Sequence, residues 1–316
     1  MDWIQTKTIL FRRFSPDVRH LIGVSGGRDS VTLLHHLVHV GYKKLIICHL
    51  NHELRGRSSN ADARFVEKLA AKYDVDLEIG SADVRAVARK KKMSIETAAR
   101  EARYSFFAKA AKHRRCTTIF LAHHADDLVE TFLLNLIRGA GLGGLAAMRD
   151  ISTRRVDKLT LTIVRPMLTV WRPEIDDYVR KHRLKFREDA SNKNLLAMRN
   201  RLRNRIIPYL EKMLGRNIRQ NLWRTATIAA DEENWIDNQL PPSTDADLSV
   251  PKLRALPVAL QRRTILKWLR AQNISEVGFD VIERVRSLAD QEVSIAKVNL
   301  PRDRHARRRA GKFFVE

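Results

Sequence analysis

The chain has 316 residues, of which 44% are hydrophobic and 30% are charged, a composition typical of a globular protein with a substantial core. It carries 59 Lys and Arg residues against 36 Asp and Glu residues, which gives a formal net charge of +23. A charge of this sign and size attracts polyanions, and nucleic acid is the commonest large polyanion. The sequence has no long uncharged apolar span and no basic amphipathic anchor, so we expect no association with a membrane.

Short apolar runs alternate with helical patterns between residues 20 and 170. This alternation predicts βαβ units, and hence an α/β fold with a parallel, twisted sheet covered by helices on both faces. Ligands bind such sheets at the carboxyl ends of the strands. In chain order, we expect strands at 20–24, 43–50, 75–80, 116–124 and 159–168, and helices at 30–39, 60–74, 94–113 and 125–139.

The pattern changes near residues 212–217, which predicts a domain boundary there. Before the boundary, Pro208 is expected to kink or end the helical pattern of residues 195–213. Beyond it the periodicity is helical, apart from a strand-like basic tail. We therefore expect one domain at residues 1–214 and a smaller, mainly helical domain at 215–316.

The two cysteines, Cys48 and Cys116, lie far apart in apolar, strand-like runs. Their spacing offers neither a disulfide framework nor a zinc site, and it indicates buried thiols in a reducing compartment. The first 17 residues lack the apolar core and the small-residue cleavage site of a signal peptide. We therefore expect a cytoplasmic protein.

The stretch "SGGRDS", residues 25–30, lies between the first predicted strand and the first predicted helix. A glycine-rich turn at this place exposes backbone N–H groups and points a helix N-terminus at a ligand, which is usually phosphate. Ser25 and Ser30 add hydroxyl donors, and Asp29 can hold Mg²⁺ against the phosphates. A plain connecting turn would explain the glycines but not the serines and the aspartate.

Three other glycine motifs fit this stretch less well. The P-loop requires a lysine that is missing here, and the dinucleotide fingerprint does not match. The residues "GVSGG" at 23–27 do match the nucleophile elbow of the α/β-hydrolases, but that elbow normally follows several strands and only one precedes it here.

The motif S-G-G-x-D-S after a first strand resembles the pyrophosphate-binding loop of the N-type ATP pyrophosphatases, which adenylate a substrate and release pyrophosphate. Further blocks resemble the tRNA(Ile)-lysidine synthetases, and the resemblance covers residues 20 to about 210. Residues 259–269 also resemble the helical domain of short members of that family. The blocks are "HLNHELRG" (49–56), "ETAAREARY" (96–104), "AHHADDLVETFLLNLIRGAGLGGL" (122–145), "RPML" (165–168), "DASN" (189–192) and "RNRLRNRIIP" (199–208).

The resemblance implies a two-step reaction on a CAU-anticodon tRNA(Ile). The wobble cytidine would attack ATP through its C2 oxygen, so that pyrophosphate leaves and an adenylated cytidine remains. The ε-amine of free L-lysine would then displace AMP and give lysidine. The resemblance implies ATP and Mg²⁺ as cofactors and tRNA(Ile) and free lysine as partners. It also implies that residues 1–214 form the catalytic domain and residues 215–316 the tRNA-binding domain.

The spacing of His123, Asp127 and Glu130 places them on one face of a helix that starts at the carboxyl end of the sheet. Carboxylates at this place can hold the lysine ammonium group and accept its proton, although acidic residues also favour a solvated helix start. By resemblance we assign Asp127 and Glu130 to lysine binding and His123 to catalysis. A metal site made of His123, His124 and Asp126 would lack a further well-spaced ligand block.

The resemblance assigns the other site residues to ATP, to the transferring phosphate or to RNA. Arg100 would stabilise negative charge in catalysis, although Glu96 one turn earlier also allows a surface ion pair. The basic run at 199–205 would contact the anticodon loop. The expected ATP-binding residues are Ser25, Gly26, Gly27, Arg28, Asp29, Ser30, Asn51 and His52, and the expected tRNA-binding residues are Arg103, Arg138, Arg199, Asn200 and Arg203.

Two other functions remain open from the sequence. One is a tRNA thiolation enzyme of the same superfamily, although Cys48 and Cys116 show no paired-cysteine motif. The other is an RNA-binding protein without catalytic activity, which the joint presence of Asp29, Asp127 and Glu130 disfavours. The sequence allows a homodimer and does not require one.

Overall fold

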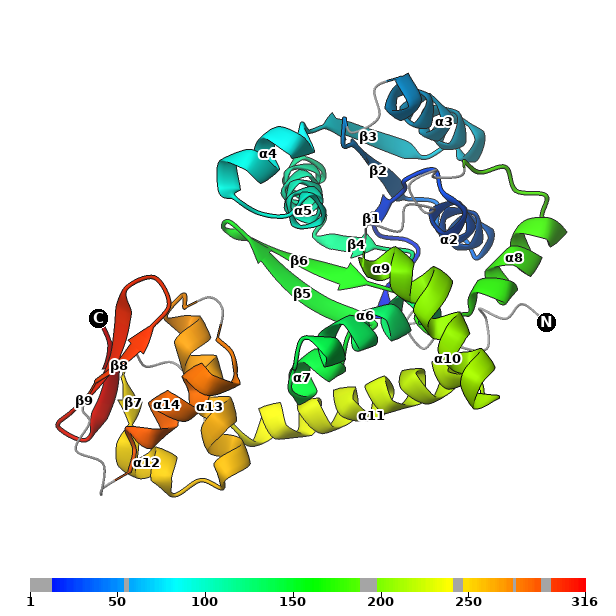
Figure 1. Ribbon diagram of the computed structural model, residues 1–316. Coiled ribbons are helices and arrows are strands. Elements are labelled where there is room, and N and C mark those ends of the chain that lie inside the picture. The colour runs from blue at the N-terminus through cyan, green and yellow to red at the C-terminus, as the bar shows by residue number, and fades with distance from the viewer. Residues whose placement is uncertain (1–12, 54–56, 188–197, 241–246, 275–276, 291–296) are drawn as a thin grey trace. The chain divides into compact units, whose positions relative to one another are not determined.

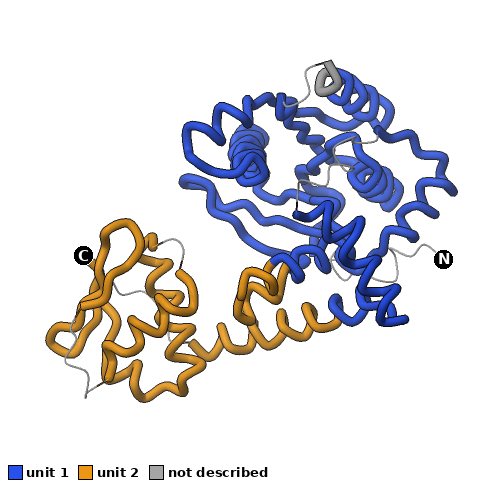
Figure 2. Tube along the Cα trace, in the orientation of Figure 1, with its two compact units in different colours: residues 1–134, 148–223 blue, residues 135–147, 224–316 orange. Residues whose placement is uncertain are grey.

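The computed structural model describes residues 13–53, 57–187, 198–240, 247–274, 277–290 and 297–316 (Figure 1). The predicted motif at 189–192 and residues 54–56 of the block at 49–56 lie outside these ranges. The chain forms two compact units, made of residues 1–134 with 148–223 and of residues 135–147 with 224–316 (Figure 2). The division at 214/215 stays a prediction. No helix among the described residues is both long and apolar enough to cross a membrane.

A six-stranded, mostly parallel sheet forms the centre of the first unit, as the sequence predicts. Five strands run parallel, and β5 (Ile151–Val156) pairs antiparallel with β6 at one edge. The order is β3-β2-β1-β4-β6-β5. The other strands are β1 (His20–Gly23), β2 (Leu45–Asn51), β3 (Asp76–Ser81), β4 (Thr118–Phe120) and β6 (Leu159–Val164).

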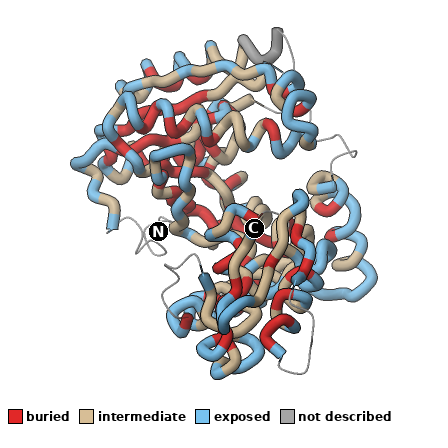
Figure 3. The backbone as a smooth tube through the Cα atoms, turned by 90° about the vertical axis from the view of Figure 1, so that its left-hand side faces the viewer, coloured by how far each residue is buried: buried red, intermediate tan, exposed pale blue. Residues whose placement is uncertain are grey.

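Helices cover both faces of this sheet because alternate residues of its strands point to opposite sides. Ile22 packs with residues of α2 (Arg28–His39), α3 (Arg57–Tyr73) and α8 (Arg172–Lys181). Its neighbour Leu21 packs on the other side against α5 (Ile95–Arg114). The buried residues accordingly follow the central strands and the inner faces of the helices (Figure 3).

Three elements of this unit were not expected from the sequence, and one of them is helix α8. Helix α4 (Val84–Lys91) buries only Val84 and Ala88, one turn apart, so its apolar face is too short to stand out in a basic sequence. Strand β5 carries Arg154 and Arg155 and lies at the sheet edge, where it lacks the continuous apolar run of a central strand.

The chain breaks regular α-helical geometry just before Pro208. Helix α9 (Met198–Arg201) continues into a π-helical turn, η2 (Leu202–Ile206), and then into α10 (Ile207–Leu214), whose first turn contains Pro208. Leu202 and Ile207 are five residues apart, yet both pack against Val129. This is possible because a π-turn pairs residues i and i+5. The helical pattern therefore does not end at Pro208 but continues to Leu214, and the kink stays a prediction.

Helix α6 (Ala125–Ile137) follows β4, and α11 (Ile218–Gln239) follows α10. In the second unit, α7 (Leu142–Leu145), α12 (Val250–Arg254), α13 (Val258–Ala271) and α14 (Phe279–Ser287) accompany a four-stranded antiparallel sheet. Trp268 and Phe313 lie in its core. The sheet order is β7-β10-β9-β8, with β7 (Leu248–Ser249), β8 (Lys297–Leu300), β9 (Arg304–Arg309) and β10 (Lys312–Val315), so the tail forms strands as expected.

Candidate functional site

The glycine turn at 25–30 connects β1 to the N-terminus of α2. Gly26 has φ +86°, a left-handed conformation that a side chain disfavours, and a Cβ there would lie 3.3 Å from the ring of Phe65. The Ser25 hydroxyl accepts the Gly27 N–H at 3.3 Å, and the Ser30 hydroxyl donates to the Gly27 carbonyl at 2.9 Å. These bonds hold a loop whose helix N-terminus suits an anion.

Asp29 in the first turn of α2 is paired with Arg172, which begins α8. Both guanidinium ends of Arg172 donate to the Asp29 carboxylate, one of them at 3.0 Å. The same guanidinium lies 2.8 Å from Nε2 of buried His124. Arg172 therefore connects the glycine turn to the start of α6, and sequence reasoning did not identify it.

Arg28 is also held by protein groups. It donates to Asp176 of α8 at 2.5 Å, and its guanidinium carbon lies 4.8 Å from the ring centre of Phe186. The Arg187 N–H donates to the Gly26 carbonyl at 3.0 Å. Residues 172–187 thus support the glycine turn from outside, while ATP binding by Arg28 stays a prediction.

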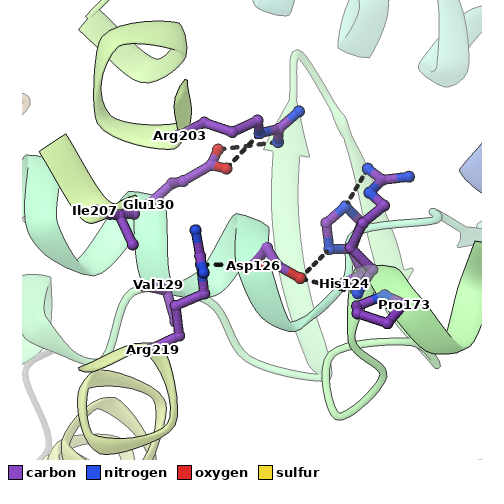
Figure 4. A pocket seen from close by; sticks show the side chains of 9 residues that line it. His124, Asp126, Val129, Glu130, Pro173, Arg203, Ile207 and Arg219 are labelled. Carbon is purple, nitrogen blue, oxygen red and sulfur yellow. Dashed lines mark hydrogen bonds and ion pairs between the residues drawn. The ribbon is translucent and has the colours of Figure 1, made fainter. Parts of the chain in front are cut away.

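The face of α6 brings the predicted acids together with predicted RNA-binding arginines. Glu130 is 1% exposed, and Arg203 donates to its two oxygens at 2.5 and 3.0 Å and to Asp127 at 3.0 Å (Figure 4). Arg199 lies 3.4 Å from Glu130 and donates to Thr131 at 2.6 Å. The acids are therefore neutralised within the protein, mainly by Arg203.

The two acids differ in their pKa values because their surroundings differ. Burial favours a raised pKa at Asp127, but the electrostatic effects of the neighbouring His124, His123 and Arg203 side chains prevail and lower the pKa to about 2. At Glu130 burial prevails over the Arg203 hydrogen bond, so its pKa is raised. Asp127 is thus a fixed negative charge, whereas Glu130 has more affinity for a proton.

Four arginines exert their positive charge on two histidines at the carboxyl ends of β2 and β4, or on one another. Burial, followed by the charge of Arg103, lowers the pKa of His52 to about 4. The pKa of His123 is lowered to about 3, first by burial and then by Arg165 and Arg103, against the opposing effect of Asp127. The arginines that repel one another or these histidines are Arg100, Arg103, Arg165 and Arg199.

This arginine cluster can bind an anion such as a phosphate, because positive charges crowded in a partly buried place favour negative charge between them. Arg100 and Arg154 both stack on the Tyr104 ring, with guanidinium carbons 5.1 and 4.1 Å from its centre. Arg165 is buried and donates to the Arg149 carbonyl at 2.7 Å. Arg165 belongs to the "RPML" block, but its charge was not assigned a role from the sequence.

The remaining predicted residues are less closely tied to the site. Asn51 ends β2, and its side chain accepts the Glu53 N–H at 2.9 Å. Arg138 follows α6 as an exposed residue of the second unit, and Asn200 lies in α9. The roles assigned to these three residues stay predictions. The described residues contain no group of three or more His, Cys, Asp or Glu suited to a metal ion, so the alternative site at His123, His124 and Asp126 is not formed.

The depressed pKa of His123 predicts a loss of stability in acid. The folded-state pKa of about 3 lies below the ordinary value of 6.5, so the unfolded chain binds a proton first as pH falls below 6.5. The wild-type protein should therefore lose unfolding free energy when the pH falls from 7 to 5.5. In His123→Asn this loss should be smaller by about 1 kcal/mol. Urea titrations at both pH values measure this. His113→Asn, at an exposed histidine, serves as control, and an unchanged pH dependence in His123→Asn would contradict the prediction.

A family model of the PP-loop domain matches residues 4–210, and a model of the TilS substrate binding domain matches residues 248–314. The tRNA(Ile)-lysidine synthase of Geobacter sulfurreducens is 36% identical over 92% of this chain, which spans only 63% of that protein. The tRNA(Ile)-lysidine synthase of Chlorobaculum tepidum is 34% identical over 86% of this chain and 83% of that protein. Among solved structures, the U34-tRNA thiolase NcsA from Methanococcus maripaludis, with its [4Fe-4S] cluster, aligns with a TM-score of 0.54 and 19% identity, covering 68% of this chain and 72% of that one. This last similarity shows the fold alone.

Proposed function

Because the chain belongs to the tRNA(Ile)-lysidine synthase family, we propose that it joins free L-lysine to C2 of the wobble cytidine of a CAU-anticodon tRNA(Ile), using ATP. The observation that carries the proposal is the arrangement of the first unit. A glycine turn suited to phosphate, a cluster of arginines suited to an anion, and the acids Asp127 and buried Glu130 all lie near the carboxyl ends of its parallel strands. A tRNA substrate also implies action in the cytoplasm.

In the first step, the C2 oxygen of cytidine attacks the α-phosphorus of ATP, and the bond to the pyrophosphate oxygen breaks. The turn at 25–30 and the N-terminus of α2 would hold the pyrophosphate part through backbone N–H groups. The arginine cluster, with Arg100 and Arg103, would stabilise the charge that develops on the transferring phosphate. The positive charge here comes from the arginines, because the pKa values of His52 and His123, lowered to about 4 and about 3, leave both rings neutral near pH 7.

Asp29 is the residue whose carboxylate would hold a magnesium ion. Mg²⁺ is commonly held by one or two carboxylates together with substrate phosphates, and Asp29 supplies a single carboxylate beside the phosphate-binding turn. Its present partner, Arg172, also has His124 as a neighbour and can release one carboxylate oxygen. When bound, Mg²⁺ would neutralise charge on the phosphates.

In the second step, the ε-amine of lysine attacks C2 of the adenylated cytidine, a C–N bond forms, and AMP leaves with the C2 oxygen. The amine must first lose a proton from its ammonium form. Glu130 suits this task because its raised pKa gives it more affinity for a proton than an ordinary carboxylate. Asp127, which stays ionised, would hold the ammonium group electrostatically.

The test is transfer of labelled lysine to a CAU-anticodon tRNA(Ile) transcript, with and without ATP, with pyrophosphate release measured in parallel. ATP-dependent label on the tRNA supports the proposal. Pyrophosphate release that requires tRNA but transfers no lysine would retain the activation step and point to another nucleophile, most directly sulfur. If neither pyrophosphate nor labelled tRNA is formed, the chain is better described as an RNA-binding protein without catalytic activity.

The alternative function, thiolation of a tRNA, has less support than ligation of lysine. Cys48 and Cys116 are free and buried, in a strand and just before a strand of the sheet. Burial raises the pKa of the Cys48 thiol, which disfavours the reactive thiolate. The relatives that match most of this chain are lysidine synthases.

A further inference from the structure

We propose that Arg219 recognises the α-carboxylate of the incoming lysine, and that this contact selects an amino acid over a simple diamine. The inference rests on the proposed function and concerns a residue that the sequence did not single out. It starts from a cavity of about 250 Å³ beside the acids of α6 (Figure 4).

The cavity has charges of both signs and an apolar wall. Its polar lining is formed by Asp126 and Glu130 on α6, with His124, Arg172, Arg203 and Arg219. Val129, Pro173 and Ile207 supply the apolar part. Free lysine needs the same set of contacts, because it carries a carboxylate, two ammonium groups and a chain of four methylene groups.

The acids lie at two separate points of the cavity. Asp126 and Glu130 are four residues apart on α6, which is about 6 Å along the helix axis. An extended lysine has about the same distance between its α-carbon and its ε-nitrogen, from five bonds of about 1.5 Å in a zigzag. In Figure 4, Glu130 points toward Arg203 and Asp126 toward His124, so the two carboxylates serve different ends of a ligand.

The proposed function places the ε-amine of lysine at the end of the cavity where Glu130 lies. The α-amino and α-carboxylate groups would then lie at the other end, near Asp126. Asp126 is ionised, since burial, which would raise its pKa, is outweighed by hydrogen bonds from His124 and the Arg172 N–H. One of its oxygens accepts the Arg172 N–H at 3.0 Å, whereas the other lies 3.7 Å from Arg219 Nε, too far for a strong hydrogen bond. That oxygen can receive the α-ammonium group.

Arg219 is the arginine best placed for the α-carboxylate. Arg172 holds Asp29 and Arg203 holds Glu130, each through two guanidinium nitrogens. Arg219 holds Glu211 through Nη1 at 2.5 Å and approaches Asp126 through Nε. Among the contacts of the described residues, none uses its Nη2. A guanidinium has five donors, so Arg219 can bind a carboxylate and keep its bond to Glu211.

The experiment compares lysine with 1,5-diaminopentane, which is lysine without its carboxylate, in the full tRNA-dependent reaction. A charged hydrogen bond that one substrate lacks changes kcat/KM by about tenfold to a hundredfold. We therefore expect the wild-type protein to prefer lysine by that factor. In Arg219→Gln, kcat/KM for lysine should fall to near that of diaminopentane through a higher KM, while diaminopentane is used as before.

Three variants distinguish a direct contact from a structural effect. Arg219→Lys keeps a positive charge and should retain part of the preference for lysine. Glu211→Gln removes the partner of Arg219 but leaves the guanidinium, and it should keep the preference. Arg216→Gln, at an exposed arginine just before α11, is the matched control.

Equal use of lysine and diaminopentane by the wild-type protein would overturn the inference, and so would an unchanged preference in Arg219→Gln. Loss of the preference in Glu211→Gln as well as Arg219→Gln would show that packing of α11, not a contact to the carboxylate, is responsible. In each of these cases lysine transfer by the wild-type protein still supports the proposed function. Absence of both pyrophosphate release and transfer would overturn the two together.

Discussion

Replacing Asp29 with alanine is expected to reduce tRNA-dependent pyrophosphate release by at least a hundredfold and to abolish lysine transfer with it. Asp29 is a carboxylate of the turn proposed to bind phosphate, and it holds Arg172, which also contacts His124. Loss of one well-placed electrostatic group in an active site costs about a hundredfold to a thousandfold in rate. Both readouts depend on the first step, so both should fall together.

The fold should tolerate this change. The side chains of Asp29 and Arg172 are 29% and 28% exposed, and ion pairs so accessible contribute only about 1 kcal/mol or less to stability. Thermal unfolding of Asp29→Ala should therefore stay close to that of the wild-type protein. Asp177→Ala, at an exposed aspartate of α8 paired with Arg180, is the control. Pyrophosphate release by Asp29→Ala within threefold of this control would contradict the assignment.

Replacing Arg203 with methionine should lower both activity and stability, because it leaves Glu130 buried without its main partner. Removing one member of a buried ion pair costs about 3–5 kcal/mol. We expect the lower end, since Arg203 is itself 31% exposed. Lysine transfer should fall at least a hundredfold, since neither acid would keep its position. Urea unfolding and the transfer assay measure the two effects.

The stability loss in Arg203→Met should also depend on pH, with a definite sign. Burial already raises the pKa of Glu130 above its ordinary value, and removal of Arg203 raises it further. Between the pKa of Glu130 in the unfolded chain and its higher pKa in the folded variant, only the folded variant keeps the proton on Glu130. The stability of the variant therefore decreases as the pH rises through this range. The deficit should be smaller at pH 5 than at pH 7.

The double variant Glu130→Gln, Arg203→Met separates charge from packing. It removes the buried charge, so it should recover most of the lost stability while lysine transfer stays lost. Arg205→Met, at an exposed arginine of the same π-turn, should behave like the wild-type protein. If the double variant is as unstable as Arg203→Met, the loss comes from packing and the charge argument is wrong.

The architecture of the first unit could be predicted because the sequence patterns that indicate its strands and helices are local. Each central strand is a short apolar run and each covering helix has its own periodicity, so the alternation along the chain was enough for the parallel sheet. Edge elements such as β5 were missed because a strand next to solvent on one side needs no such run. Pro208 indicated a disturbance of the helical pattern, but no feature of the sequence showed that a π-turn before it lets the helix continue to Leu214.

The sequence pointed to candidate site residues only where they follow a strand or share one helix face. Asp127 and Glu130 share a face of α6, whereas His123, expected on the same helix face, precedes α6, which begins at Ala125. Arg172 and Arg219 meet neither condition, because they start helices that look like ordinary surface helices in the sequence, and only tertiary folding brings them to Asp29 and Asp126. Arg203 was expected to contact RNA, and its pairing with the acids depends on packing between α6 and the π-turn, which no local pattern shows.

The π-turn at 202–206 lets this helix contain one residue more than a regular α-helix of the same length and still keep its contacts. It is equivalent to one residue inserted into an α-helix, and it lets Leu202 and Ile207 face Val129 together. Deleting one of the exposed residues 204–206 would turn this segment into a regular α-helix. Leu202 and Ile207 would then be four positions apart and would still share a face, so both could stay against Val129. A deletion of one residue should therefore be tolerated here, whereas a deletion of two residues would turn Ile207 away from the core.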